Sequence, residues 1–191
     1  MNVLAYGIAS SLFSLLWMAD GAPSAPHTPQ PFELKSSAFA SGAALPSQYS
    51  YSGYGCTGRN TSPALAWSGA PNGTKYFALT LFDPDARGGG FWHWIVFDIP
   101  ADVTQLPGNA GAGSGSLMPQ GAVQGRNDFQ TVGYAGPCPP PGGGAHHYRF
   151  TLYALDQHLD GLSPLTSGPT LVSALRGHVL GKAELIGIFQ R

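Results

Sequence analysis

The chain has 191 residues, of which 43% are hydrophobic, 27 are Gly and 17 are Pro. This length suits one domain, and the hydrophobic share is sufficient for a packed core, so the glycines and prolines indicate a turn-rich, mainly β protein rather than a disordered one. Only 10% of the residues are charged and the net charge is -1, which disfavours nucleic acids and anionic membrane surfaces as partners.

The first 25 residues differ in composition from the rest of the chain. Residues 12–18 are apolar, and residues 19–26 are mostly small residues and prolines, as in a secretory signal. The apolar stretch is well short of the roughly 20 residues that a membrane-spanning helix needs, so we expect no transmembrane segment in the mature chain. No Lys or Arg precedes it, and a mis-assigned start or a disordered terminus is the alternative. We predict a signal or disordered terminus over residues 1–25, one domain over residues 26–191, and export, with a cytoplasmic location as the alternative.

Six short periodic segments, separated by Gly-rich and Pro-rich turns, predict β-strands. They comprise residues 32–36, 64–68, 75–82, 92–99, 146–155 and 183–190. The third segment is apolar on both faces, which predicts a central strand covered on both sides. Residues 108–125 are rich in Gly, Ala and Ser and predict a long irregular excursion, and loops of this length commonly imply function or mobility.

One helix is predicted near the carboxyl end of the chain. Its apolar stripe consists of Leu171, Leu175 and Val179, which recur every four residues, and Gly181 can end it. Gly177 inside such a helix costs about 1 kcal/mol relative to Ala. We therefore expect a short or frayed helix, or one that closely approaches a neighbouring element.

The two cysteines, Cys56 and Cys138, both lie in turn-like contexts next to Gly or Pro. We expect them to form a disulfide, which would close a loop of about 82 residues and contribute about 4.5 kcal/mol through chain entropy. A disulfide would also imply an oxidising compartment. The alternative is a pair of reduced thiols in a cytosolic protein. Metal binding by these cysteines is not favoured, because no C-x-x-C spacing occurs.

Polar side chains stand at three predicted strand ends. Asp83 ends the third segment, and Pro84 restricts its backbone to an extended conformation. Most Asp residues in such turns accept hydrogen bonds from the turn itself, which is our interpretation of Asp85. His93 opens the fourth segment, where alternate residues from His93 to Ile99 are expected to share one apolar face. The alternative is that His93 is a structural residue at the edge of the core, with its hydrogen bonds made within the protein.

The fifth predicted segment has two faces of different character, because side chains alternate along a strand. His146 and Tyr148 lie on the apolar face and are expected to point inward, whereas His147 is expected to meet solvent. Three strand ends thus supply Asp83, His93, and His146 with Tyr148. A concave site with a few convergent polar groups is the usual form of a ligand pocket, and we predict one here.

The polar groups of this predicted pocket suit an oxyanion such as phosphate. Imidazole N–H and phenol O–H groups donate hydrogen bonds, while Asp83 repels a bare dianion but accepts from a protonated phosphate oxygen or an ammonium. We therefore predict a preference for partly protonated anions. Histidines that become charged at about pH 6.5 should strengthen binding at the acidic end. Arg87 could reach in from the glycine-rich loop that follows Asp83.

Four ordered motifs carry a resemblance to a known family: Asp83-Pro84-Asp85, residues 93–100, Gly136-Pro137 and His146-x-Tyr148. They resemble the phosphatidylethanolamine-binding protein family, and within it the bacterial Raf-kinase-inhibitor-like branch. The likeness runs from about residue 32 to residue 191. It implies a Greek-key β-sandwich with few short helices and a small anion pocket at one edge. Carried over residue by residue, the ligand-binding residues are Asp83, His93, Gly136, Pro137, His146 and Tyr148, with Asp85 as a second-rank member.

Two positions depart from the family pattern. Arg87 stands where the family often has proline, and it adds a positive charge near the mouth of the predicted pocket. His147 stands where the family often has arginine. Because His147 is expected to point outward, its presence should affect surface recognition more than the pocket.

The leading functional hypothesis is a non-catalytic binding protein for a phosphate-bearing small molecule or a phospholipid headgroup, with inhibitory or regulatory contacts to other proteins as the resemblance implies. We expect no cofactor and no bound metal. One alternative is a metal-dependent enzyme, because two histidines and a carboxylate are also the ligands of mononuclear iron sites. A hydrolase is disfavoured because no G-x-S-x-G motif occurs. The last alternative is a protein-interaction module that uses residues 108–125 as its recognition surface.

Overall fold

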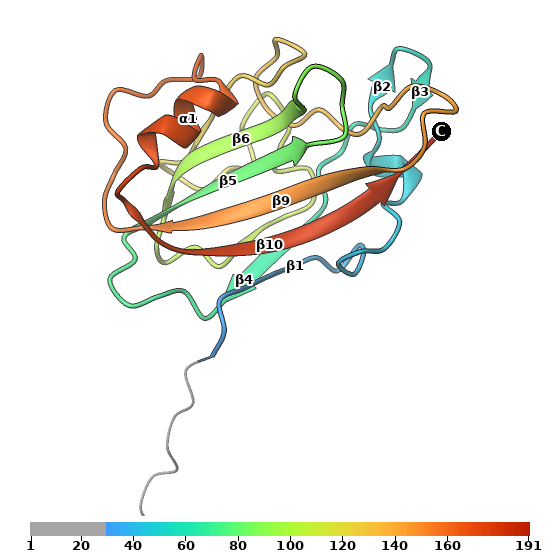
Figure 1. Ribbon diagram of the computed structural model, residues 1–191. Coiled ribbons are helices and arrows are strands. Elements are labelled where there is room, and N and C mark those ends of the chain that lie inside the picture. Colours follow the sequence, from blue (N-terminus) through green and yellow to red (C-terminus); the bar gives the residue numbers. More distant parts are fainter. Residues whose placement is uncertain (1–29) are drawn as a thin grey trace, which may run out of the picture.

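Two packed β-sheets and one short α-helix form the core of residues 30–191, the part of the chain that this computed structural model describes (Figure 1). The predicted signal over residues 1–25 lies outside the described residues. The larger sheet has five strands in the order β10 (Val179–Phe189), β9 (His146–Leu155), β5 (Tyr76–Asp83), β6 (Phe91–Pro100) and β8 (Val123–Gln124). The smaller sheet has the order β1 (Glu33–Lys35), β4 (Leu65–Ser68) and β7 (Gln105–Leu106). The remaining elements are the hairpin of β2 (Ser52–Gly53) and β3 (Cys56–Thr57), a 3-10 helix (Ser47–Tyr49) and α1 (Gly168–Ala174).

The larger sheet has Greek-key topology. The strands β5, β6 and β8 follow one another as antiparallel neighbours, and β9 then returns to the other side of β5. The resulting spatial order, β9-β5-β6-β8, is that of a Greek key. Together with the smaller sheet packed against it, this topology confirms the predicted β-sandwich with few short helices.

Two hydrophobic clusters lie on the two faces of the larger sheet. The first fills the space between the sheets and includes Trp67 and Leu79. The second lies between the larger sheet and α1 and includes Ile95 and Leu171. Strand β5 contributes to both clusters, because Leu79 belongs to the first and its neighbour Ala78 to the second. The prediction of a central strand covered on both sides is therefore confirmed.

Helix α1 ends well before the predicted boundary. The first two residues of the predicted apolar stripe are buried against the sheet, but the third, Val179, already begins β10. Gly177 is not inside a helix: its φ of +84° is a left-handed conformation that suits glycine. The chain reverses there and enters β10, which also contains Gly181. The prediction that the helix runs up to Gly181 is thus wrong.

Strand β6 overturns the prediction that alternate residues from His93 to Ile99 share one face. Ile95 and Phe97 belong to the cluster beneath α1, whereas Ile99 belongs to the cluster between the sheets. The pairing of β5 with β6 shifts register twice. At one shift, no residue of β5 pairs directly with His93. At the other, Asp98 adopts a φ of +56°. Each bulge reverses the alternation, so period two holds only between them.

Residues 108–125 form successive hydrogen-bonded turns that lead into β8. Ala112 N–H, for example, donates to Asn109 O at 3.1 Å. The side chain of Gln124 ties these turns to β6, because it accepts from Trp94 Nε1–H at 2.7 Å and donates to Ala112 O at 2.9 Å. The predicted irregular excursion is therefore anchored to the larger sheet.

Candidate functional site

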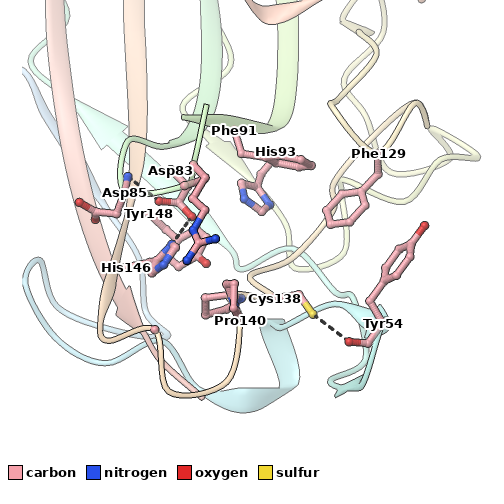
Figure 2. Close-up of a pocket in the computed structure, with 14 residues that line it drawn as sticks. Tyr54, Asp83, Asp85, Phe91, His93, Phe129, Cys138, Pro140, His146 and Tyr148 are labelled. Carbon is pink, nitrogen blue, oxygen red and sulfur yellow. Dashed lines mark hydrogen bonds and ion pairs between the residues drawn. The ribbon is translucent and has the colours of Figure 1, made fainter. Parts of the chain in front are cut away.

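A pocket of about 420 Å³ lies at the end of the larger sheet where β5 ends and where β6 and β9 begin (Figure 2). Because β6 and β9 both run antiparallel to β5, the last residues of β5 meet the first residues of both neighbours. Five predicted site residues line the pocket, namely Asp83, Asp85, His93, His146 and Tyr148. The other lining residues are Tyr54, Ala86, Arg87, Phe91, Phe129, Cys138, Pro139, Pro140 and Gly143.

Asp83 and His146 form a buried hydrogen-bonded pair in the pocket wall. His146 Nδ1–H donates to Asp83 Oδ2 at 2.7 Å, and Asp85 N–H donates to Asp83 Oδ1 at 2.9 Å. Both carboxylate oxygens of Asp83 therefore have a donor, which fixes the orientation of the side chain. Among residues 30–191, none forms a hydrogen bond with the other ring nitrogen of His146, Nε2.

His93 is a neutral hydrogen-bond acceptor toward the pocket. Its Nδ1 lies 2.7 Å from Ala135 O, and because a carbonyl oxygen only accepts, Nδ1 must carry the proton. Burial lowers the pKa of His93 to about 4, so the ring is uncharged at neutral pH. In this tautomer Nε2 bears a lone pair. The prediction that both histidines would charge at about pH 6.5 is therefore wrong for His93.

Tyr148 contributes a hydroxyl group that has no partner in the described part of the protein. The residue is fully buried, and its Oη makes no hydrogen bond to residues 30–191. Burial, followed by the charge of Asp83 and the interaction of the hydroxyl with that carboxylate, raises the pKa of Tyr148, which keeps the phenol protonated. The hydroxyl therefore faces the Asp83 carboxylate, but the two groups do not meet hydrogen-bond geometry. An unpaired buried hydroxyl costs free energy of about 1–3 kcal/mol. Tyr148 therefore has a donor available for a guest in the pocket.

Asp85 belongs to the rim of the pocket, and the interpretation that it accepts hydrogen bonds from its own turn is wrong, because its carboxylate pairs with the neighbouring strand β9. Its Oδ2 accepts from the backbone N–H of His147 at 2.7 Å and lies 2.9 Å from His147 Nδ1. These hydrogen bonds lower the pKa of Asp85, the backbone bond being the largest cause. As predicted, His147 points away from the core, and both side chains are partly exposed to solvent.

Gly136 and Pro137 lie behind the pocket wall rather than in it. Neither is among the residues that line the pocket. Gly136 N–H donates to Asn60 Oδ1 at 2.7 Å, and Pro137 O accepts from Tyr51 N–H at 3.0 Å. A Cβ on Gly136 would lie 2.1 Å from Tyr49 O, so only glycine fits there. The sequence motif thus marks a close backbone contact that supports the pocket.

The predicted disulfide is present, because Cys56 and Cys138 are bonded. It joins the β2–β3 hairpin to the loop that precedes β9, and both segments line the pocket. Sequence reasoning missed the aromatic residues Tyr54, Phe91 and Phe129 of the lining. Tyr54 and Phe129 lie in turns distant from the strand ends in sequence. No motif marked Tyr54, and although Phe129 ends a stretch that shares the family likeness, residues 125–129, nothing in the sequence placed it at the pocket.

Comparison with known proteins identifies close relatives over most of the chain. The UPF0098 protein YbcL of Escherichia coli (strain K12) is 44% identical over 160 residues, which cover 83% of this chain and 87% of YbcL. The crystal structure of E. coli YbcL, described as a new member of the mammalian PEBP family, matches with a TM-score of 0.82 and covers 84% of this chain and 98% of that one. The putative lipoprotein LppC of Mycobacterium tuberculosis (strain ATCC 25618 / H37Rv) is 41% identical over 162 residues, which cover 84% of this chain and 73% of LppC.

The family model that describes phosphatidylethanolamine-binding proteins matches residues 35–190. This match spans all the strands of the larger sheet and every polar residue of the pocket. It agrees with the Greek-key sandwich and with the relatives above, and it confirms the resemblance seen in the sequence motifs. The chain therefore belongs to the phosphatidylethanolamine-binding protein family.

Proposed function

We propose that the protein is a non-catalytic binding protein whose pocket holds a partly protonated phosphate group, either as free phosphate or as part of a phospholipid headgroup. The observation that carries this proposal is the buried hydroxyl of Tyr148, which has no partner among residues 30–191 and belongs to the lining of a 420 Å³ pocket. An inhibitory or regulatory role toward other proteins, which the family resemblance implies, stays a prediction.

The polar groups of the pocket include both donors and acceptors. Tyr148 O–H donates, and Arg87, whose guanidinium is also a donor, is among the residues that line the pocket. His93 Nε2 and the carboxylate of Asp83 accept. A fully ionised oxyanion offers only acceptors and would face both of these groups with repulsion. A phosphate with one protonated oxygen supplies the missing donor and suits the mixed set.

This chemistry predicts that the pH dependence of binding follows the ligand. His93 stays neutral down to about pH 4 because of its burial, so it gains no charge in the range where phosphate esters titrate. Phosphate monoesters lose their second proton at about pH 6. Binding should therefore be tighter at about pH 5.5 than at about pH 8, because the monoanion dominates at the lower pH. Sulfate, which stays a dianion throughout, should bind more weakly than phosphate at both values.

The enzymatic alternatives receive less support from the pocket. Among residues 30–191, no set of three His, Cys, Asp or Glu side chains is placed to hold a metal ion. The lining contains no Ser or Thr, and its only cysteine is bonded to Cys56, so the pocket has no serine, threonine or free cysteine to act as the nucleophile. We therefore favour binding over a metal-dependent or hydrolytic reaction.

Export is the second part of the proposal. The bond between Cys56 and Cys138 supports an oxidising compartment, and the related LppC carries the name of a putative lipoprotein. The signal-like composition of residues 1–25 points the same way. None of the helices in the described part of the chain is long and apolar enough to cross a bilayer. Cell fractionation with thiol labelling would test this location, and recovery of the reduced protein in the cytoplasm would contradict it.

Isothermal titration calorimetry tests the binding proposal. Inorganic phosphate, phosphoethanolamine and sulfate are titrated into the protein at about pH 5.5 and about pH 8. His146→Ala should weaken phosphate binding by about tenfold or more, because it removes a ring that lines the pocket and releases Asp83. His158→Ala is the matched control, since His158 also pairs with a buried aspartate but far from the pocket. Absence of binding by both phosphate compounds, or equal affinity of wild type and His146→Ala, would overturn the proposal.

A further inference from the structure

One side of the pocket is aromatic and lies across from the polar end. Figure 2 shows Phe129 and Tyr54 together on the side opposite Asp83 and His146, and Phe91 lies above His93. We call Tyr54, Phe91 and Phe129 the aromatic wall. The family motifs of the polar end do not include these residues, and the proposed phosphate site makes no use of them.

The aromatic wall is continuous with the polar end through His93. The ring centroids of Phe91 and His93 are 4.9 Å apart, and those of Phe129 and His93 are 6.1 Å apart. A phosphate ester bound beside His93 would therefore have its organic group directly next to these rings. This short separation favours a group bonded directly to the phosphate oxygen over one on a long linker.

The rings of the wall are arranged by stacking. Tyr51, which lies behind the wall, stacks on Phe129 with centroids 4.4 Å apart and planes inclined by 5°. Tyr54 is inclined by 23° to Phe129 at 5.7 Å, and Phe91 meets Phe129 edge to face at 4.8 Å. Nearly parallel rings favour an additional planar ring in an offset stack. A saturated chain would gain burial but no such pairing.

Tyr54 is held at the pocket although its side chain is 78% exposed. Its backbone has a φ of +51°, which is unfavourable for a residue other than glycine. The hairpin that carries it is bonded to the opposite loop through Cys56 and Cys138. In addition, Arg191 donates to Pro139 O at 2.8 Å and to Tyr54 O at 3.5 Å. The backbone that carries Tyr54 is thus tied to the loop that contains Cys138 and Pro139.

No charged side chain belongs to the aromatic wall itself. Asp83 and Asp85 lie on the side of the pocket opposite Tyr54 and Phe129, where their carboxylates are hydrogen-bonded to His146 and His147 (Figure 2). A cationic group placed against the wall would therefore lose hydration without gaining a carboxylate partner. The wall fits an uncharged planar group better than a choline-like or ethanolamine-like one.

We propose that the aromatic wall is a second subsite, which holds the planar ring of an aryl phosphate ester while the phosphate occupies the polar end. This inference rests on the proposed function, because it requires the phosphate to bind beside His93 and Tyr148. Tyr54 is the residue that determines the preference for an aromatic ester. Its exposed ring can be changed without disturbing the core.

Calorimetric titration at about pH 5.5 with four esters tests the subsite: phenyl, cyclohexyl and methyl phosphate, and choline phosphate. Phenyl phosphate should bind about tenfold more tightly than methyl phosphate, with the other two esters in between or weaker. In Tyr54→Ala this advantage should fall by about fivefold, while inorganic phosphate binds as before. Tyr54→Phe should retain it. Leu165→Ala, at a residue that is also strongly exposed but lies outside the pocket, is the matched control.

The outcomes separate the subsite from the phosphate site. Suppose that inorganic phosphate binds, but phenyl and methyl phosphate bind with equal affinity, or Tyr54→Ala keeps the preference for phenyl phosphate. The proposed subsite is then wrong, and the proposed phosphate site is unaffected. Equal binding of cyclohexyl and phenyl phosphate, or tightest binding of choline phosphate, also contradicts an aromatic subsite. If no phosphate compound binds, the proposed function itself fails.

Discussion

The two ends of the five-stranded sheet carry the same kinds of side chain in different states. At the pocket end, Asp83 is paired with His146. At the opposite end, Asp98 lies near the end of β6 and is paired with His158, whose ring also packs edge to face on Tyr76. Both aspartates are buried, and each has an aromatic side chain nearby.

The difference lies in what remains unpaired. Asp98 accepts from Leu159 N–H at 3.3 Å and lies 3.2 Å from His158 Nε2, while His158 Nδ1 lies 3.0 Å from Asp160. Both ring nitrogens and both carboxylate oxygens are therefore occupied. At the pocket end, the hydroxyl of Tyr148 has no partner among residues 30–191. A histidine–aspartate pair is thus not by itself a sign of a binding site. The sign is a hydrogen-bonding group that has no protein partner and lies at a cavity.

The largest expected effect comes from the cross-link at the pocket end. Replacing both cysteines, Cys56→Ala with Cys138→Ala, should lower the free energy of unfolding by about 4.5 kcal/mol, because the closed loop is long. Urea unfolding measures this change. Hydrogen exchange should show the loss of protection first in the β2–β3 hairpin and last near Asp98. A variant as stable as wild type would show that the hairpin is held without the bond.

Acid should affect the two ends in opposite directions. The pKa of His93 falls to about 4 on folding, so its contribution to stability is complete above about pH 6.5 and is lost as the pH falls through about 4, a change of about 3 kcal/mol. Burial raises the pKa of Asp98, so its contribution instead grows as the pH falls. Urea unfolding of wild type and His93→Gln between neutral pH and about pH 4 measures the first effect. An identical pH slope in both proteins would contradict it.

Gly136→Ala distinguishes a supporting residue from a ligand-binding one. The added Cβ would clash with the backbone of Tyr49, so we expect destabilisation by about 2 kcal/mol. In thermal unfolding, the substitution should lower Tm by the same amount with saturating phosphate as without phosphate. A variant that is as stable as wild type but no longer binds phosphate would contradict this, because it would show that Gly136 contacts the ligand.

The smallest effect is expected at the far end of the sheet. His158→Ala removes a half-exposed ring that pairs with the buried Asp98, and because solvent screens the His158 side of the pair, we expect a loss of about 0–1 kcal/mol. Chemical denaturation should register at most this change, and calorimetry should show unaltered phosphate affinity. A loss of phosphate affinity in this variant would contradict the comparison, because it would show that the two ends of the sheet are energetically coupled.

Part of the fold and of the candidate site could be predicted from the sequence, because there the local pattern agrees with the tertiary structure. The inward direction of His146 and the outward direction of His147 follow from period two, and β9 keeps that period because its pairing with β5 is regular and its pairing with β10 shifts only at the far end, at Val179 and Gly181. The bond between the cysteines and the meeting of strand ends at Asp83 were also predictable.

The rest depends on tertiary structure that no local pattern encodes. The face of His93 was unpredictable because the bulges in β6 arise from its register with β5. The lowered pKa of His93 follows from complete burial, which sequence alone does not reveal. Tyr54 and Phe129 reach the pocket from turns whose positions depend on the disulfide and on stacking with Tyr51.

Tyr148→Phe tests the central claim most directly, because it removes one unpaired oxygen and leaves the ring. Calorimetry should show a loss of phosphate affinity of about tenfold or more, since the lost bond is to a charged group. Urea unfolding should show unchanged or higher stability, since the hydroxyl has no partner in residues 30–191 to lose. Unchanged phosphate affinity together with a clear loss of stability would contradict the account, because it would make the hydroxyl a structural group.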